Sequence, residues 1–261
     1  ERLLKDLLGN SQASANKTNG WRLNGKTIRV AAGTYDMKDN VNNGLLTLKY
    51  ESMTTFSVVG GYAGTETDLT QNDPENNVTV FTSSNPSSVT NNRMFSVNDA
   101  KMSCTFDGIK FTGTNYIGRG GIAYFNDSAG YGKCEFKNCT FDGVKNTSYG
   151  GAIDLNNTKV SDFLSFTNCT FKDNSATYGG AVIIEASKGE TGPVFTNCTF
   201  TGNQSTVTSG TTGGGGAIYV KGANAAVTIN GGTFNGNTTK IVGGGAIIAV
   251  GKGSEVRINN T

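Results

Sequence analysis

The chain has 261 residues, a net charge of +2 from 22 basic and 20 acidic residues, and no histidine. The basic residues are mixed with acidic ones along the sequence, so neither nucleic acid nor an anionic membrane is an expected partner. The lack of histidine removes the commonest general base and transition-metal ligand, so any catalysis would have to rest on carboxylates, lysine, arginine or tyrosine. We assign no catalytic residue and no metal site. Thirty-seven glycines, three prolines and short, evenly spaced hydrophobic groups indicate many turns between short strands.

The chain begins with a leucine stripe, at Leu3, Leu4, Leu7 and Leu8. This spacing predicts a short amphipathic helix. We expect the helix, within a cap region at residues 1–26, to cover the open end of a stack of strands. No run of eighteen apolar residues occurs, so we expect no segment that spans a membrane. The chain starts without a methionine or an apolar signal core and stops abruptly, so we expect a mature or trimmed piece of a longer protein.

Residues 27–100 contain strand-like pieces without a clear repeat, and we interpret them as degenerate early coils. These pieces are residues 27–30, 46–49, 55–59, 78–81 and 94–97. No linker separates them from the regular repeats of residues 101–261. We therefore predict one domain over residues 1–261.

Further along the chain, two motifs recur with one period. Gly-Gly followed by small or apolar residues begins at residues 120, 150, 179, 215 and 244, which are spaced by 30, 29, 36 and 29. A phenylalanine column follows the same period at Phe111, Phe141, Phe171, Phe200 and Phe234. Two columns that share a period predict a solenoid in which each repeat forms one coil.

Within each repeat, apolar and polar residues alternate, as in Cys139-Thr140-Phe141 and Ile153-Asp154-Leu155. This alternation is typical of half-buried strands. A period near thirty, with two or three short strands per coil and no helical pattern, predicts an all-β fold, the right-handed parallel β-helix of pectate-lyase-like solenoids.

The cysteines and some asparagines also recur with this period. They form the columns Cys104 and Cys134; Cys139, Cys169 and Cys198; and Asn138, Asn168 and Asn197. We expect the thiols to stack in the core, although the spacing of adjacent coils also permits disulfides. No C-x-x-C pair occurs, which disfavours a zinc site. We expect the asparagines to form a structural ladder that satisfies buried polar groups in a turn.

The repeats resemble the polymorphic-outer-membrane-protein repeats first described in chlamydial autotransporter adhesins, which combine F-x-x-N with G-G-A followed by Ile, Leu or Val. F-x-x-N stands at residues 171–174, 200–203 and 234–237, and G-G-A at residues 150, 179, 215 and 244. Two earlier repeats have Thr114 and Val144 in place of the asparagine. Residues 28–35 and 59–66 resemble the opening coils of secreted β-helix proteins of gut Bacteroidales. The resemblance implies an exported, outer-membrane-associated or secreted bacterial adhesin.

One outward column fits an interaction surface. It consists of Tyr124, Asp154, Ile183, Tyr219 and Ile248, which alternate with the inward residues of one strand per coil. We expect Tyr124, Asp154 and Tyr219 to contribute to a face that binds a host or microbial glycan or a surface protein. The same residues also suit strands in general, and a loop could cover them.

The alternative is a polysaccharide lyase or glycoside hydrolase that acts on an acidic polysaccharide, because parallel β-helices host such enzymes. A lyase needs a basic residue near carboxylates that hold calcium, and a hydrolase needs converging aspartates. The nearest candidates are Asp107 beside Lys137 and Asp142 beside Lys172, which look more like surface ion pairs. No specific motif supports calcium, so no cofactor is predicted.

Overall fold

The computed structural model describes residues 24–36, 46–48, 54–68, 70–83, 93–97, 102–113, 115–116, 118–126, 132–156, 163–185, 192–209, 213–241 and 243–259. Within these ranges the chain forms strands and turns, and no helix. The helix predicted from Leu3, Leu4, Leu7 and Leu8 lies outside the described residues.

The strands form four parallel sheets, which we name A to D. Sheet A consists of β1 (Lys26–Ala31), β4 (Thr54–Tyr62), β7 (Met102–Asp107), β11 (Cys134–Lys137), β15 (Leu164–Thr167), β19 (Val194–Thr196), β23 (Ala226–Asn230) and β27 (Glu255–Asn259). Sheet B consists of β2 (Gly33–Asp36), β5 (Thr79–Thr82), β8 (Ile109–Thr112), β12 (Thr140–Asp142), β16 (Thr170–Lys172), β20 (Thr199–Thr201) and β24 (Thr233–Asn235). Sheet C consists of β3 (Leu46–Leu48), β6 (Phe95–Val97), β10 (Ala123–Phe125), β14 (Ile153–Leu155), β18 (Val182–Ile184), β22 (Ile218–Val220) and β26 (Ile247–Ala249). Sheet D consists of β9 (Asn115–Tyr116), β13 (Lys145–Asn146), β17 (Ser175–Ala176), β21 (Gln204–Ser205) and β25 (Thr238–Thr239).

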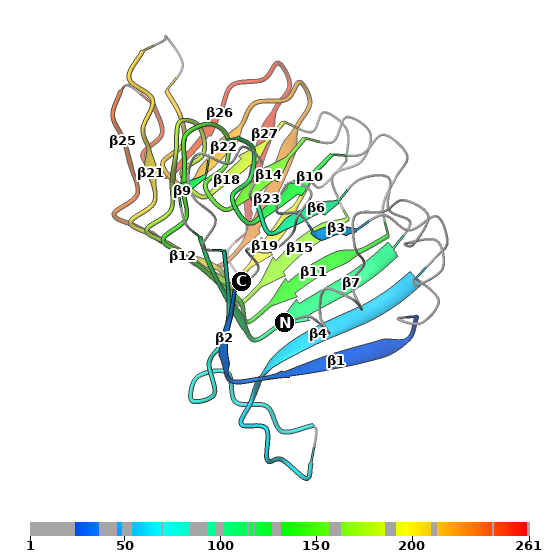
Figure 1. Cartoon of the computed structure of the whole chain (residues 1–261). Coiled ribbons are helices and arrows are strands. Elements are labelled where there is room, and N and C mark those ends of the chain that lie inside the picture. Colours follow the sequence, from blue (N-terminus) through cyan, green and yellow to red (C-terminus); the bar gives the residue numbers. More distant parts are fainter. Residues whose placement is uncertain are drawn as a thin grey trace.

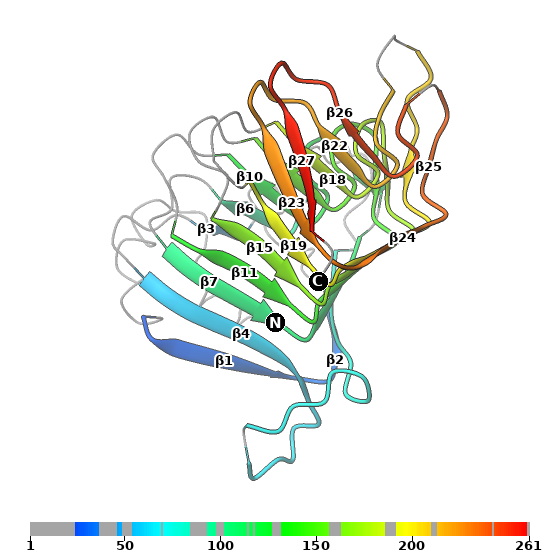
Figure 2. The same ribbon diagram turned by 180° about the vertical axis from the view of Figure 1, so that it is seen from behind.

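The sequence period is the length of one coil. Phe136 pairs in register with Phe106 on one side and with Phe166 on the other, so that each repeat lies on the previous one. The coils rise in chain order from β1 at the bottom of Figure 1 to β26 and β27 near the top, and Figure 2 shows sheet A as a continuous stack from behind. The predicted fold class, a right-handed parallel β-helix, is confirmed. The strands from residues 27–100 belong to the same sheets as the later repeats.

The regular coils contain four strands where two or three were predicted. The additional strands belong to sheet D, in which each strand is two residues long, as in β13 and β17. Two residues are too few to show a period of two, so no sequence pattern could reveal them.

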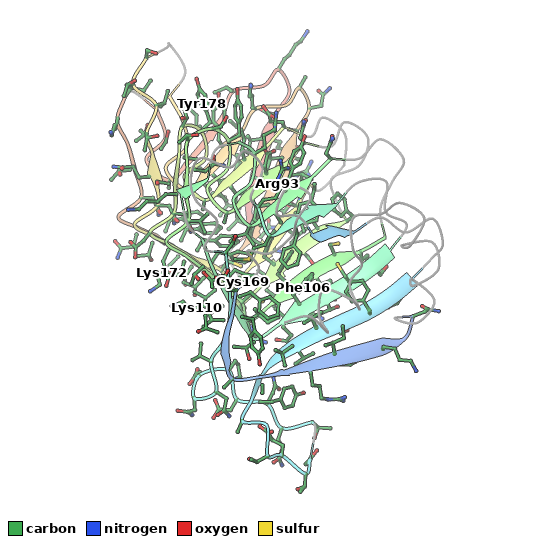
Figure 3. All side chains as sticks on the ribbon, in the orientation of Figure 1. Arg93, Phe106, Lys110, Cys169, Lys172 and Tyr178 are labelled. Atoms are coloured by element: carbon green, nitrogen blue, oxygen red, sulfur yellow. The ribbon has the colours of Figure 1, made fainter. Side chains whose placement is uncertain are left out.

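The core is built from stacked phenylalanine rings. Phe171 lies at 0% exposure, with its ring centroid 4.5 Å from that of Phe141 and 4.7 Å from that of Phe200. A second column from sheet A meets the first edge-on, and Phe166 lies 5.4 Å from Phe171 in this way. Figure 3 shows Phe106 and Cys169 on the side of the strands that faces this interior. The phenylalanine column is therefore the central packing element of the solenoid.

The Gly-Gly-Ala motif marks a turn in which adjacent coils touch through their backbones. A Cβ atom on Gly151 would lie 2.0 Å from the carbonyl oxygen of Gly180, and one on Gly180 would lie 2.0 Å from the carbonyl oxygen of Gly216. No side chain fits at these distances. The spacing of the coils therefore requires glycine at residues 151, 180 and 216, whereas a Cβ on Gly245 in the last motif would lie 3.1 Å from its nearest neighbour.

The asparagine of F-x-x-N forms a buried amide ladder. The Nδ2 of Asn203 donates to the carbonyl oxygen of Phe171 (2.9 Å) and to Oδ1 of Asn237 (2.9 Å), and its Oδ1 accepts from Nδ2 of Asn174 (2.9 Å). Asn174 and Asn203 are fully buried. The ladder begins at Val144, whose backbone N–H donates to Oδ1 of Asn174 (3.0 Å). This network satisfies polar groups that burial would otherwise leave unpaired.

The expectation that Asn138, Asn168 and Asn197 satisfy buried polar groups was wrong. These side chains are exposed, and the residues have φ values of 50°, 54° and 52°. Asparagine tolerates this left-handed conformation better than most residues, and here it allows the chain to turn from sheet A to sheet B. The amide of Asn168 still donates to Oδ1 of Asn138 (3.3 Å), so a ladder exists at the surface.

Candidate functional site

The predicted outward residues lie on sheet C, where they alternate with core residues. Tyr124 pairs in register with Asp154, and Ile183 with Tyr219. They point away from the phenylalanine core, yet Asp154 and Ile183 are 0% exposed and Tyr219 is 3% exposed. The face is therefore covered rather than open to a ligand.

The covering residues Arg119, Tyr149 and Tyr178 come from the turn between sheets D and C, and Arg93 precedes β6 of sheet C. Tyr178 stacks on Tyr149 and on Tyr219, with ring centroids 5.5 Å apart in both pairs. The guanidinium of Arg119 lies 4.8 Å above the ring of Tyr149, and that of Arg93 lies 4.5 Å above the ring of Tyr124. Stacked tyrosines and cations thus form a second layer over the outer side of sheet C.

Charges of both signs tie this layer to the coils beneath. Nε of Arg119 lies 2.8 Å from Oδ2 of Asp154, and the same guanidinium contacts Glu185. Nζ of Lys221 lies 3.0 Å from Oε1 of Glu185. Burial raises the pKa of Asp154 to about 6, although Arg119, Arg93 and Lys221 oppose this rise. These ion pairs connect several coils and so have a structural role. Ligand binding by Tyr124, Asp154 and Tyr219 stays a prediction.

The pKa of Asp154 predicts a pH-dependent stability. The folded pKa lies above the value of about 3.9 for an unfolded aspartate, so the folded state binds the proton more tightly. The stability that this proton provides is therefore lost as the pH rises from about 4 through about 6. We expect the wild type to lose about 2–3 kcal/mol of unfolding free energy relative to Asp154→Asn between pH 4 and pH 7. Urea unfolding at both pH values measures it, and a difference that does not change with pH contradicts the prediction.

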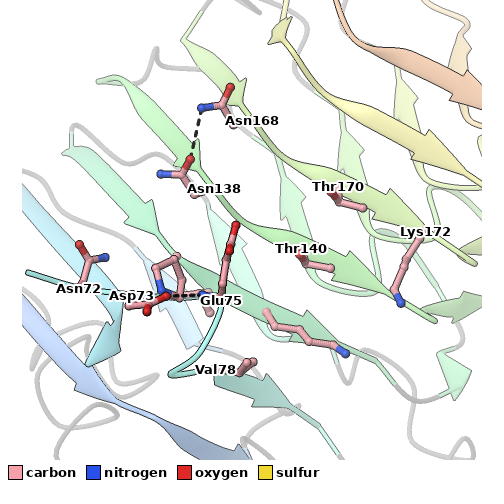
Figure 4. Close-up of a pocket in the computed structure, with 13 residues that line it drawn as sticks. Asn72, Asp73, Glu75, Val78, Asn138, Thr140, Asn168, Thr170 and Lys172 are labelled. Atoms are coloured by element: carbon pink, nitrogen blue, oxygen red, sulfur yellow. Dashed lines mark hydrogen bonds between the residues drawn. The ribbon is translucent and has the colours of Figure 1, made fainter. Parts of the chain in front are cut away.

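A groove lies on the outer side of sheet B, beside the loop of residues 72–78. Figure 4 shows this loop facing the strands β8, β12 and β16. The groove has a volume of about 720 Å³, within the size range of ligand sites. Its lining consists of Asn72, Asp73, Pro74, Glu75 and Val78 from the loop, and Gly108, Ile109, Lys110, Asn138, Thr140, Asn168, Thr170 and Lys172 from the coils.

The coil side of the groove repeats its polar groups from one coil to the next. Thr140 pairs in register with Thr170, and Asn138 is hydrogen-bonded to Asn168. Hydroxyl and amide groups are thus presented at the spacing of parallel strands, about 4.8 Å. On the loop side of the groove, the carboxylate of Asp73 accepts hydrogen bonds from Glu75 and Asn76 and so stabilises the conformation of the loop. The side chain and backbone of Asn76 lower the pKa of Asp73.

Lysines mark one margin of the groove. Oδ2 of Asp142 lies 2.9 Å from Nζ of Lys110 and 3.3 Å from Nζ of Lys172. Figure 3 shows the two lysines close together on one side of the molecule, away from Tyr178. One carboxylate between two ammonium groups leaves this margin with excess positive charge.

The sequence pairs considered for catalysis have different outcomes. Asp142 does lie beside Lys172, as the stacked positions indicated, and Lys110 completes the group. Asp107 and Lys137 are also partners in register, but Asp107 accepts from Nδ2 of Asn138 (2.8 Å), and Lys137 forms its ion pair with Glu135 (3.0 Å). The charge partner of a strand residue can lie on its own strand, and coil spacing does not reveal this.

Two further features are absent from the described part of the chain. Within those ranges, no group of three or more Cys, Asp or Glu side chains is placed to hold a metal ion. No helix there is long and apolar enough to cross a membrane.

Comparison with known proteins gives one family match. Residues 197–221 match the Chlamydia polymorphic membrane protein repeat. This segment contains Phe200, Asn203 and the Gly-Gly-Ala motif at residue 215, whose structural roles are the ring stack, the amide ladder and the close turn. No curated protein and no solved structure gave a significant match, and nothing supports the Bacteroidales resemblance. The matched repeat and the fold together support a β-helix protein that is similar to the polymorphic membrane proteins.

Proposed function

We propose that the protein is a non-enzymatic adhesin of the cell surface or the secreted fraction, and that the groove beside the 72–78 loop binds an extended glycan. The groove is the observation that carries this proposal. The family match supports the location, because the matched repeat is named for membrane proteins of Chlamydia. The rigid stack of coils supports a role in presenting a surface.

The chemistry of the groove favours a glycan over an apolar ligand. A glycan offers hydroxyl groups at regular intervals, and Asn138, Asn168 and Thr170 offer amide and hydroxyl groups that repeat with the coils. Val78, with 40% of its surface exposed, and Pro74 give apolar contacts for the C–H faces of sugar rings. Such a mixture of a few polar groups with apolar surface is typical of ligand sites.

Cleavage of an acidic polysaccharide is the second candidate, and the lysine margin favours it. Lys110 and Lys172 suit the carboxylates of uronic acids, and a lysine can act as the base of a lyase. Asp142 lies between these ammonium groups, which suits an ion pair better than proton transfer. We therefore place binding ahead of cleavage.

The test uses the column of Asn138, Asn168 and Asn197, of which only the first two residues line the groove. Because Asn138 and Asn168 have positive φ, replacing both with glycine removes the amides while the backbone keeps its conformation. We expect the double variant Asn138→Gly/Asn168→Gly to bind its glycan at least about 10-fold more weakly, which corresponds to the loss of one or two hydrogen bonds. Asn197→Gly is the matched control, because Asn197 has the same conformation and does not line the groove.

The measurement is a glycan array, with and without calcium, followed by calorimetry on the glycans that bind. Equal losses in the Asn197 control, or a full affinity in the double variant, would place the binding site elsewhere. New reducing ends or the ultraviolet absorbance of unsaturated uronides would show that the enzyme alternative is correct. If the chain bound a surface protein and no glycan, the adhesin role would stand and the glycan ligand would be wrong.

A further inference from the structure

Cys104 and Cys134 face each other on the neighbouring strands β7 and β11. They are direct partners in the parallel register, and both side chains belong to the buried core. Adjacent strands lie about 4.8 Å apart, within the range of Cα separations that a disulfide spans. The structure places the two Sγ atoms 2.9 Å apart. A disulfide bond is about 2.05 Å long, so a movement of about 0.9 Å would join them.

The surroundings hold the two thiols in this position. Phe106 and Phe136, two residues along the same strands, are stacked in register with ring centroids 5.2 Å apart. Phe95 and Ala123 from sheet C line a small internal space together with both cysteines. The backbone register and the ring stack therefore keep the two cysteine side chains facing each other.

In the second cysteine column, Cys169 also interacts with the thiols of Cys139 and Cys198, but all three thiols have backbone acceptors as well. The Sγ atoms of Cys139, Cys169 and Cys198 each donate to a carbonyl oxygen of the preceding coil, at 3.5, 3.4 and 3.5 Å. The carbonyl oxygen two residues before each cysteine is an alternative acceptor for the same S–H group. These thiols act as hydrogen-bond donors to the backbone, and three of them in one column cannot all form pairs.

We propose that Cys104 and Cys134 form a disulfide between adjacent coils when the chain folds in an oxidising compartment. The oxidant is a small-molecule disulfide such as oxidised glutathione, or a disulfide-exchange protein. One cysteine thiolate attacks a sulfur of the oxidant, which forms a mixed disulfide and releases one half of the oxidant as a thiol. The thiolate of the other cysteine then attacks the cysteine sulfur of the mixed disulfide and releases the second half of the oxidant as a thiol. The two cysteines lose two electrons and two protons in total, and the oxidant is reduced to two thiols.

The bond forms while the coils dock rather than afterwards. Cys104 is 3% and Cys134 is 1% exposed, so the folded coils keep a disulfide oxidant away from both thiols. The thiol of Cys134 and burial also raise the pKa of Cys104 well above its usual value. Only the thiolate attacks a disulfide. The folded, reduced protein is therefore expected to oxidise slowly, and refolding in the presence of oxidant is expected to be fast.

Peptide mapping tests the proposal directly. The chain is refolded with reduced and oxidised glutathione, denatured, alkylated without reduction and digested with trypsin. Cleavage after lysine places Cys104 in the peptide of residues 102–110 and Cys134 in that of residues 134–137, while the other cysteines fall in residues 138–145, 160–172 and 189–221. We expect peptides 102–110 and 134–137 to be linked. Of the five cysteines, three (5 − 2) should remain free on titration of the denatured protein.

Variants and stability complete the test. Cys104→Ala should leave four free thiols (5 − 1) and no link, and Cys169→Ala should keep the link and leave two (5 − 1 − 2). The bridged wild type should melt on the order of 5–10 °C above the reduced wild type, because the bridge closes a loop of about thirty residues. Five free thiols in the refolded wild type, or a link between other cysteines, would overturn the proposal.

Discussion

Replacement of Phe171 by aspartate is expected to prevent the chain from folding. The carboxylate would lie between the rings of Phe141 and Phe200, at a position with 0% exposure and no charged partner in the ring stack. Loss of the phenylalanine contacts alone costs about 3–5 kcal/mol, and burial of the carboxylate adds to this. Since domains of this kind have only about 5–15 kcal/mol of net stability, the variant should be unfolded or insoluble at 25 °C.

Circular dichroism and thermal melting measure the effect, with Phe171→Leu as the control. Leucine keeps the site apolar, so this variant should remain folded with a loss of about 1–3 kcal/mol. A melting temperature of Phe171→Asp equal to that of the wild type would mean that the side chain does not point into the core. The phenylalanine column would then have to be assigned to the surface.

Gly180→Ala is expected to destabilise the protein by at least about 4 kcal/mol. The new Cβ would lie 2.0 Å from the carbonyl oxygen of Gly216 and 2.6 Å from the backbone nitrogen of Gln204. Both obstacles are backbone atoms, so the coils must separate, and the hydrogen bonds of the turn weaken with them.

Gly143→Ala is the matched control. Gly143 has a φ of 69°, and a Cβ there would have nothing within 4 Å, so only the left-handed conformation opposes the methyl group, at about 1–2 kcal/mol. Chemical unfolding of both variants gives the two free energies. If Gly180→Ala lost no more stability than Gly143→Ala, the close contact between coils would be refuted as the reason for the motif.

The sequence was sufficient to predict the stacking because one period governs all of it. Phe171, Cys169 and Thr170 each lie beside their equivalents in the next coil, as the shared spacing predicted. A period identifies which residues are equivalent, but it does not state which of them are buried. The buried ladder of Asn203 and the exposed one of Asn138 have similar spacing, and only the conformation of the turn distinguishes them.

The groove and the covering layer could not be predicted, because each depends on residues outside the alternating pattern. The 72–78 loop interrupts the path between β4 and β5, and no repeat relates it to the strands that it faces. Arg119 lies in a turn, 35 positions before its partner Asp154. A charge pattern that returned with the coil period would have indicated this pair; a single arginine could not.

The amide ladder has a direction, which affects the order of folding. The backbone N–H and the side-chain amide of Asn174 both donate to Oδ1 of Asn203, and those of Asn203 both donate to Oδ1 of Asn237, so the bonds from one asparagine to the next all run toward the C-terminal coil. The same side-chain amides also donate back to Phe141 and Phe171 in the preceding coils. A completed coil thus presents donors, and the coil that follows it in the chain brings the acceptor. In a chain that emerges from the ribosome N-terminus first, each new coil finds a finished template, so growth of the solenoid can keep pace with synthesis.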